Sequence, residues 1–266
     1  MGGPGAPSLH WASMPEPQDV HAYLERLGVT SAAPSLELLT ELHVAHLERV
    51  PFENLDIHRG VPIRIDEPSI LAKLARGRGG FCYELNGGFG WLLRALGFDV
   101  TYVEGRVAHR LGGYGIRFDH LALVVQLRER HLVDVGFGDS FLRPLRLIEG
   151  VVQEDAAGTF RIRRLGASNL LERRGSDGHW AHEFRWLDAP RELTDFEPGS
   201  RYHQSSRVSS FTQRAICTRV DAGTRITLHR DRLVRGDRTV PIEGEDDWRR
   251  ALAAHFGITL SDEPSA

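Results

Sequence analysis

The sequence has few cysteines, a single lysine and no long hydrophobic run. Two cysteines, Cys82 and Cys217, occur among its 266 residues. They are too few for a disulfide framework, and no cysteine pair has the spacing of zinc ligands, so we expect no metal site. No uninterrupted stretch of about 18 apolar residues is present, which argues against a transmembrane helix. Of the 33 lysines and arginines, only Lys73 is a lysine, and all the others are arginines.

The charge balance gives no reason to expect a polyanionic partner. The formal net charge is −3, with 33 Lys and Arg against 36 Asp and Glu. We therefore expect neither nucleic acid nor an anionic membrane as a partner. The first 18 residues are rich in glycine, proline and serine and lack the basic and apolar regions of a secretory signal. We expect residues 1–18 to form a disordered tail, and the protein to be cytoplasmic.

The hydrophobic periodicity changes along the chain. Residues 19–97 have helical spacing, and four helices are predicted there, the last of which stops at Gly97. Each predicted helix begins at or near a residue that suits a cap, a first helical turn or the exit from a glycine-rich turn: Asp19, Ser35, Pro68 and Cys82.

The rest of the chain is richer in strand patterns. Residues 98–190 contain short β-branched or alternating runs between glycine-rich turns. Residues 191–266 combine strands predicted over 212–220 and 224–229 with a helix over 246–256. The order therefore predicts an α+β protein with a helical domain, an all-β domain and a smaller α/β domain.

Cys82 stands where a thiol becomes a nucleophile. It follows the glycine-rich turn at residues 78–81 and opens the fourth predicted helix. At a helix N-terminus, unpaired backbone N–H groups and the positive end of the helix dipole stabilise a thiolate. Most free cysteines behave instead as small buried hydrophobic residues. That second interpretation suits Cys217, which lies within a predicted strand.

An imidazole and a carboxylate follow in settings that suit a buried site. His120 precedes an apolar run, and Asp134 lies between two valines. A buried carboxylate needs a partner, which an imidazole supplies. Cys82, His120 and Asp134 therefore form a predicted Cys-His-Asp triad, in which the imidazole takes the thiol proton. Residues of the same types remain as alternatives: His109, His131, His203, Asp119 and Asp139.

Two charged residues near the cysteine are predicted to support it. We expect Glu53 and Arg78 to form an ion pair that fixes the cysteine loop, and the alternative is a solvated surface arginine. Glu84 lies in the first turn of the predicted helix, where its negative charge interacts favourably with the helix dipole.

The three segments that carry the triad resemble the arylamine N-acetyltransferase family. They are Arg78-Gly79-Gly80-Phe81-Cys82-Tyr83-Glu84-Leu85-Asn86, then the segment around His120, then Leu132-Val133-Asp134-Val135-Gly136-Phe137-Gly138. Pro51-Phe52-Glu53-Asn54-Leu55 resembles a further motif of that family. The resemblance extends over most of the chain, from about residue 20 onward.

The resemblance implies a fold and an activity. The fold would be an N-terminal helical bundle (19–97), a central β-barrel (98–190) and a C-terminal α/β lid (191–266), around a cysteine-protease-like Cys-His-Asp core. The activity would be acetyl transfer from acetyl-CoA to the nitrogen of an aromatic amine or hydrazine, by a ping-pong path through acetyl-cysteine.

The resemblance also implies which residues bind the substrates. Phe52, Phe137, Gly138 and Phe211 would line the pocket, with few charged contacts, and the glycine would let coenzyme A approach the backbone. The stretch Ser205-Ser206-Arg207-Val208-Ser209-Ser210-Phe211 departs from the family pattern. We expect Arg207 either to restrict the acceptor or to recruit an anionic one.

Three other functions remain open at this point. Some proteins that resemble this family are amide synthases, which close a macrolactam with the same triad. Cysteine proteases and transglutaminases share the Cys-His-Asp chemistry, but they need an open peptide groove, whereas residues 212–256 suggest a lid. A binding module without catalytic activity would leave the three-part constellation unexplained.

Overall fold

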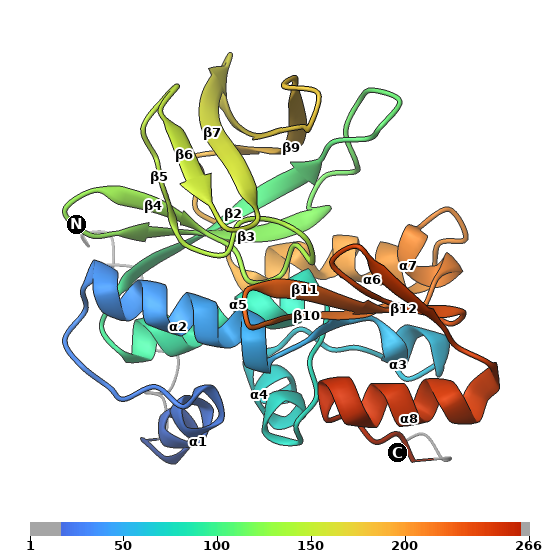
Figure 1. Cartoon of the computed structure of the whole chain (residues 1–266). Coiled ribbons are helices and arrows are strands. Elements are labelled where there is room, and N and C mark those ends of the chain that lie inside the picture. The colour runs from blue at the N-terminus through green and yellow to red at the C-terminus, as the bar shows by residue number, and fades with distance from the viewer. Residues whose placement is uncertain (1–16, 262–266) are drawn as a thin grey trace, which may run out of the picture.

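The structure is a computed structural model that describes residues 17–261. It has an α+β architecture (Figure 1). The N-terminal helices lie against one side of an eight-stranded, barrel-like sheet, and the C-terminal segment adds a second sheet with a helix on its outer face. The division into three domains remains a prediction.

The N-terminal segment is helical, as its periodicity predicts. Its five helices are α1 (Pro17–Leu27), α2 (Leu36–Arg49), α3 (Leu55–His58), α4 (Glu67–Ala75) and α5 (Cys82–Ala95). Ser35 caps α2 as predicted, because its side chain accepts a hydrogen bond from the Leu38 N–H. The prediction for Asp19 was wrong: α1 begins two residues earlier, so Asp19 lies in its first turn, where a carboxylate still suits the helix dipole. Of the predicted tail, residues 17 and 18 belong to α1, and residues 1–16 lie outside the described residues.

The larger sheet has the strand order β5-β4-β3-β2-β9-β8-β7-β6, and all its paired strands are antiparallel. Its eight strands are β2 (Asp99–Val107), β3 (His120–Gln126), β4 (Arg130–Val133), β5 (Leu145–Arg146), β6 (Val152–Asp155), β7 (Gly158–Leu165), β8 (Ser168–Arg174) and β9 (Trp180–Leu187). The sheet curls so far that it nearly closes (Figure 1).

Strand β3 belongs to two hydrophobic cores at once. Leu121, Leu123 and Val125 join the core that packs against the N-terminal helices, whereas Ala122 and Val124 join the core inside the curled sheet. Successive side chains of a strand point to opposite faces, so a strand covered on both faces becomes an uninterrupted apolar run. That double burial fixes the position of β3, and therefore of His120 at its start.

The C-terminal segment builds a five-stranded sheet that includes a strand from the N-terminal part. The order is β1-β10-β11-β12-β13. Its strands are β1 (Phe52–Glu53), β10 (Cys217–Asp221), β11 (Thr224–Leu228), β12 (Arg232–Arg235) and β13 (Arg238–Pro241). Three short helical segments precede β10, namely η1 (Leu193–Phe196), α6 (Glu197–Ser205) and α7 (Ser210–Gln213), and α8 (Gly244–Phe256) follows β13.

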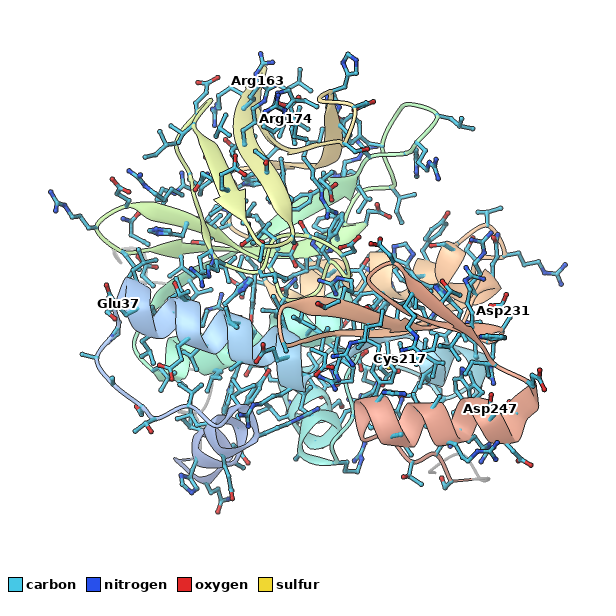
Figure 2. The ribbon with its side chains drawn as sticks, viewed as in Figure 1. Glu37, Arg163, Arg174, Cys217, Asp231 and Asp247 are labelled. Atoms are coloured by element: carbon cyan, nitrogen blue, oxygen red, sulfur yellow. The ribbon has the colours of Figure 1, made fainter. Side chains whose placement is uncertain are left out.

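Cys217 lies in the core between this sheet and α8 (Figure 2). Its pKa is raised by burial and by the Glu53 carboxylate. The prediction of packing is thus confirmed for Cys217, but the predicted strand over 212–220 was wrong in its first half. Ser209 caps α7 instead, and the strand begins only at Cys217. Among the described residues, none of the helices has the length and apolar character needed to cross a membrane.

Candidate functional site

Cys82 is the first residue of α5, where a helix offers free backbone N–H groups. It is 3% exposed. The N–H of Phe81, just before it, donates to Oε2 of Glu84 at 3.2 Å, so Glu84 holds the first turn. A Cβ atom on Gly136 would lie 2.8 Å from the Cα of Cys82. Only glycine therefore lets the segment after β4 pass so close to the cysteine.

His120 and Asp134 form a buried pair beside Cys82. Nε2 of His120 lies 2.6 Å from Oδ2 of Asp134, and Cys82 is among the groups that raise the pKa of His120. His120 opens β3 and Asp134 follows β4, which are neighbours in the sheet. The imidazole packs edge-on against Phe137 and Phe184. The structure thus brings together the three residues of the predicted triad.

The charge state of His120 follows from these partners. Burial acts to lower the pKa of His120. The Asp134 carboxylate, its hydrogen bond to the ring and Cys82 together outweigh burial and raise that pKa to about 10. The imidazole is therefore protonated at neutral pH, between a carboxylate and a thiol.

Asn86 was missed by the sequence analysis, although it stands one helical turn after Cys82. Its Nδ2 donates to Oδ1 of Asp134 at 2.7 Å and to the Leu121 carbonyl at 2.7 Å, and its Oδ1 accepts from the Val135 N–H at 2.9 Å. Asn86 thereby joins the cysteine helix to both strands that carry the His–Asp pair.

The alternative residues have other partners. Asp139 lies near Arg173 and Arg225, at 3.5 and 3.2 Å. Nδ1 of His131 contacts the Glu129 carbonyl at 3.1 Å. Asp119 instead pairs with His203, a contact that the sequence did not indicate.

A buried cluster of charged side chains lies next to the loop that leads to Cys82. Arg78 Nη2 lies 2.7 Å from Oε1 of Glu53 and 2.9 Å from Oδ1 of Asp56, so the predicted Glu53–Arg78 pair is present. Lys73 Nζ lies 2.9 Å from Oδ2 of Asp56 and 2.8 Å from Oε1 of Glu84. Burial and the Glu53 carboxylate outweigh Lys73 and raise the pKa of Glu84 to about 7. The single lysine of the chain thus holds α4 against the start of α5.

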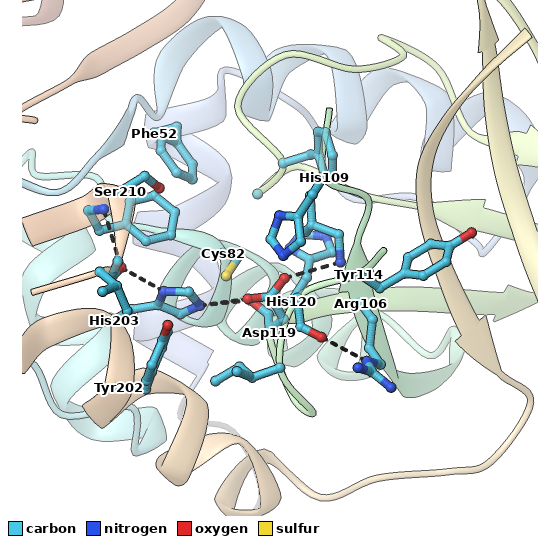
Figure 3. Close-up of a pocket in the computed structure, with 18 residues that line it drawn as sticks. Phe52, Cys82, Arg106, His109, Tyr114, Asp119, His120, Tyr202, His203 and Ser210 are labelled. Carbon is cyan, nitrogen blue, oxygen red and sulfur yellow. Dashed lines mark hydrogen bonds and ion pairs between the residues drawn. The ribbon is translucent and has the colours of Figure 1, made fainter. Parts of the chain in front are cut away.

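Cys82 and His120 line a cavity of about 590 Å³ (Figure 3). Three of the predicted binding residues line it: Phe52, Phe137 and Phe211. Two charged side chains, Arg106 and Asp119, and two further histidines, His109 and His203, also line the cavity, so its wall is more polar than the aromatic residues alone predict. Arg207 is exposed and does not line it. The four residues that follow it, 208–211, do line the cavity.

A second cavity, of about 380 Å³, adjoins the first. The two share four lining residues: Phe52, Phe137, Ser210 and Phe211. Gly138, which has a φ of +93°, lines only the second cavity. Three basic side chains also line only the second: Arg214, Arg225 and His229. Within residues 17–261, no cluster of three or more His, Cys, Asp or Glu side chains could hold a metal ion.

Comparisons with known proteins place the chain in a family. A family model described as N-acetyltransferase matches residues 35–264. The chain is 33% identical over 263 residues to the arylamine N-acetyltransferase of Mycolicibacterium smegmatis, covering 92% of this chain and 93% of that relative. The chain belongs to the arylamine N-acetyltransferase family. The resemblance stated from the sequence motifs is thereby confirmed.

Two solved arylamine N-acetyltransferases and one further relative are also similar to the chain. The solved arylamine N-acetyltransferase of Salmonella typhimurium superposes with a TM-score of 0.87 at 30% identity, over 92% of both chains. A Mycobacterium marinum enzyme, solved in complex with CoA, gives a TM-score of 0.84 at 30% identity, over 90% of this chain and 92% of its own. Proansamycin X synthase of Amycolatopsis mediterranei is 30% identical, over 89% of this chain and 95% of its own.

The raised pKa of His120 predicts how alkylation of Cys82 depends on pH. The imidazolium is lost only as the pH rises through about 10, so we expect the rate with iodoacetamide to vary little between about pH 7 and about pH 9. In His120→Gln, the rate should climb across that window, as for a free thiol that ionises near about pH 8.5. Mass mapping of the adduct to Cys82 is the control, and a native rate that climbs as steeply as the variant's would refute the prediction.

The charge cluster predicts a large cost for removing Lys73. Lys73→Met leaves the buried Glu84 carboxylate without its cation, so we expect a loss of about 3–5 kcal/mol in urea unfolding at neutral pH. The loss should shrink towards pH 5. A buried carboxyl whose folded-state pKa lies above its unfolded value stabilises the fold in its protonated form, so stability returns as the pH falls. Arg64→Met is the matched control: its partner Asp66 and Arg64 are both exposed, and the expected loss is below about 1 kcal/mol.

Proposed function

We propose that this protein transfers the acetyl group of acetyl-CoA to the nitrogen of an aromatic amine or hydrazine, through an acetyl-cysteine on Cys82. The observation that carries the proposal is the contact of Cys82 with a buried His120–Asp134 pair at a helix N-terminus. The family membership supports the reaction class.

The first half-reaction is acylation of the enzyme. The Cys82 sulfur attacks the thioester carbonyl carbon, and the negative charge moves to the carbonyl oxygen, where backbone N–H groups at the start of α5 stabilise it. The C–S bond to coenzyme A then breaks. The coenzyme A thiolate takes the proton held by His120, and Asp134 keeps the imidazole in position throughout.

The second half-reaction returns the enzyme to its starting state. The amine nitrogen attacks the carbonyl carbon of acetyl-Cys82, the new N–C bond forms and the C–S bond to Cys82 breaks. The amine loses one proton, and His120 regains the proton that it gave to coenzyme A. The sequence of the two steps is a ping-pong path.

The second cavity suits the donor. Arg214 lines it, and a guanidinium favours phosphate groups such as those of coenzyme A. The shared aromatic wall, which includes Phe52 and Phe211, leads from it to the cavity of Cys82. We propose that the donor enters there with Gly138 giving close access to the backbone, while the acceptor occupies the larger cavity.

Acetylation of Cys82 tests the chemistry directly. Incubation with acetyl-CoA and no acceptor should add one acetyl group to the protein by intact mass. Cys82→Ala should abolish the addition, because the nucleophile is gone. Cys217→Ala is the matched control and should acetylate like the native protein. An acetyl group that maps to Cys217 in the native protein would overturn the assignment.

The acceptor separates this function from that of an amide synthase, which the similarity to proansamycin X synthase keeps as the second candidate. We expect the acetylated protein to transfer its acetyl group to arylamines or arylhydrazines, measured as N-acetyl product. A protein that acylates readily but transfers to no amine or hydrazine would favour the amide synthase. Arg207→Ala should leave acceptor preference unchanged, since Arg207 lies outside both cavities.

A further inference from the structure

A second histidine–carboxylate pair faces the cavity that Cys82 lines. His203 lies on α6, and Asp119 directly precedes His120. Nε2 of His203 lies 3.2 Å from Oδ1 of Asp119, and their side chains are only 8% and 11% exposed. Both residues line the cavity (Figure 3). The reaction as proposed above gives neither of them a role.

The contacts of the His203 ring fix where its proton lies. Nε2 faces two acceptors, Oδ1 of Asp119 and the Asp119 carbonyl oxygen, each at 3.2 Å. A bare ring nitrogen against two oxygens would be repulsive, so Nε2 carries the hydrogen. Oδ2 of Asp119 accepts from the Val107 N–H at 3.1 Å, which fixes the carboxylate. In the neutral ring, Nδ1 is therefore an acceptor.

Ser209 supplies the donor for that nitrogen. Its Oγ lies 3.0 Å from Nδ1 of His203 and accepts from the Phe211 N–H at 3.3 Å. A hydroxyl has one hydrogen and two acceptor positions. The hydrogen points to His203 and one acceptor position takes Phe211. Among the described residues this oxygen has no further partner, so one acceptor position remains on a side chain that lines the cavity.

We infer that Ser209, His203 and Asp119 form a second proton relay, which takes the proton of the acceptor amine. The inference rests on the proposed function. His120 is already protonated before acylation, and it must regain one proton when the amine attacks. A separate base near the acceptor would remove the amine proton while the C–N bond forms, independently of the state of His120.

The amine proton leaves through Ser209 and His203 while the new N–C bond forms. The amine N–H donates to the free position of Ser209 Oγ, and the Ser209 proton passes to Nδ1 of His203. The amine nitrogen forms its bond to the acetyl carbon, and the C–S bond to Cys82 breaks. The resulting imidazolium is stabilised by Asp119 and afterwards gives its proton to solvent in the cavity, while His120 takes one proton from the same solvent, so both histidines return to their starting states. Ser209 ends with one proton, as it began.

The aromatic side chains beside the relay suit its substrate. The His203 ring packs edge-on against Phe211, with centroids 4.9 Å apart. Phe211 in turn lies 6.0 Å from Phe52 and from Phe81 by ring centroid. An aromatic acceptor that stacks in this group would place its ring against Phe211, whose backbone N–H already contacts Ser209. The relay would therefore meet the nitrogen of a ring-bearing amine.

The two half-reactions of the native full-length protein test the relay separately. Acylation is followed by loss of acetyl-CoA in a single turnover, and deacylation by mixing isolated acetyl-enzyme with aniline or with hydrazine. In His203→Gln and Ser209→Ala we expect deacylation by aniline to fall at least about 10-fold, with acylation changed by less than about 2-fold. Hydrazine, the stronger nucleophile, should lose less. The double variant should be no slower than the slower single variant, because both residues act in one relay.

Matched variants separate the relay from a structural role. Ser209→Thr keeps the hydroxyl and should restore deacylation, whereas Ser205→Ala and His182→Gln change exposed residues outside the cavity and should leave both rates unchanged. An equal fall of both half-reactions, or no fall in deacylation, would overturn the relay. Native protein that takes up no acetyl group from acetyl-CoA would instead refute the proposed function, and the relay with it.

Discussion

The buried carboxylate of Asp134 is the constraint on which the site depends. One of its oxygens binds His120, and the other accepts from Asn86 and from the Gly136 N–H. Its backbone N–H meets Nε2 of His43 at 3.3 Å. Asp134 is 2% exposed, and burying a carboxylate to that extent without hydrogen-bond donors would destabilise the fold. The helical segment and the barrel-like sheet are therefore joined through one polar group, and the cysteine, carried on the helix of Asn86, is set against the histidine of the sheet.

The position of the cavity follows from the two-sided burial of β3. The strand has one face in the barrel core and the other against the N-terminal helices, so its first residue, His120, lies at the junction of the two layers. The C-terminal segment completes the enclosure, because β1 pairs with β10 and brings Phe52 to the second sheet. Helix α7 then adds Phe211. A polar centre with aromatic walls results, which suits a flat acceptor next to a reactive thioester.

Sequence patterns found the parts of the site that have local causes. A glycine-rich turn before a helical run marked Cys82, and an apolar run marked His120, because strand burial leaves a signature in consecutive residues. The same patterns missed strands β8 and β9, because charged residues interrupt their apolar runs. Only one face of β9 is buried, and it carries Phe184 and Trp186. The only sequence feature that linked Asn86 to the site was its position one helical turn after Cys82, which is a weak indication of a functional role.

Taken alone, the sequence determined the helical start, the strand-rich middle, the candidate nucleophile and the family resemblance, because each depends on residues close together in the chain or on ordered motifs. Tertiary structure alone decided the polar character of the cavity. His203 and Asp119 stand 84 positions apart and meet only because α6 folds back onto the start of β3. Lys73 likewise acquires its role through carboxylates from α3 and α5. Contacts between distant segments leave no periodic pattern in a single sequence, so local spacing could not reveal them.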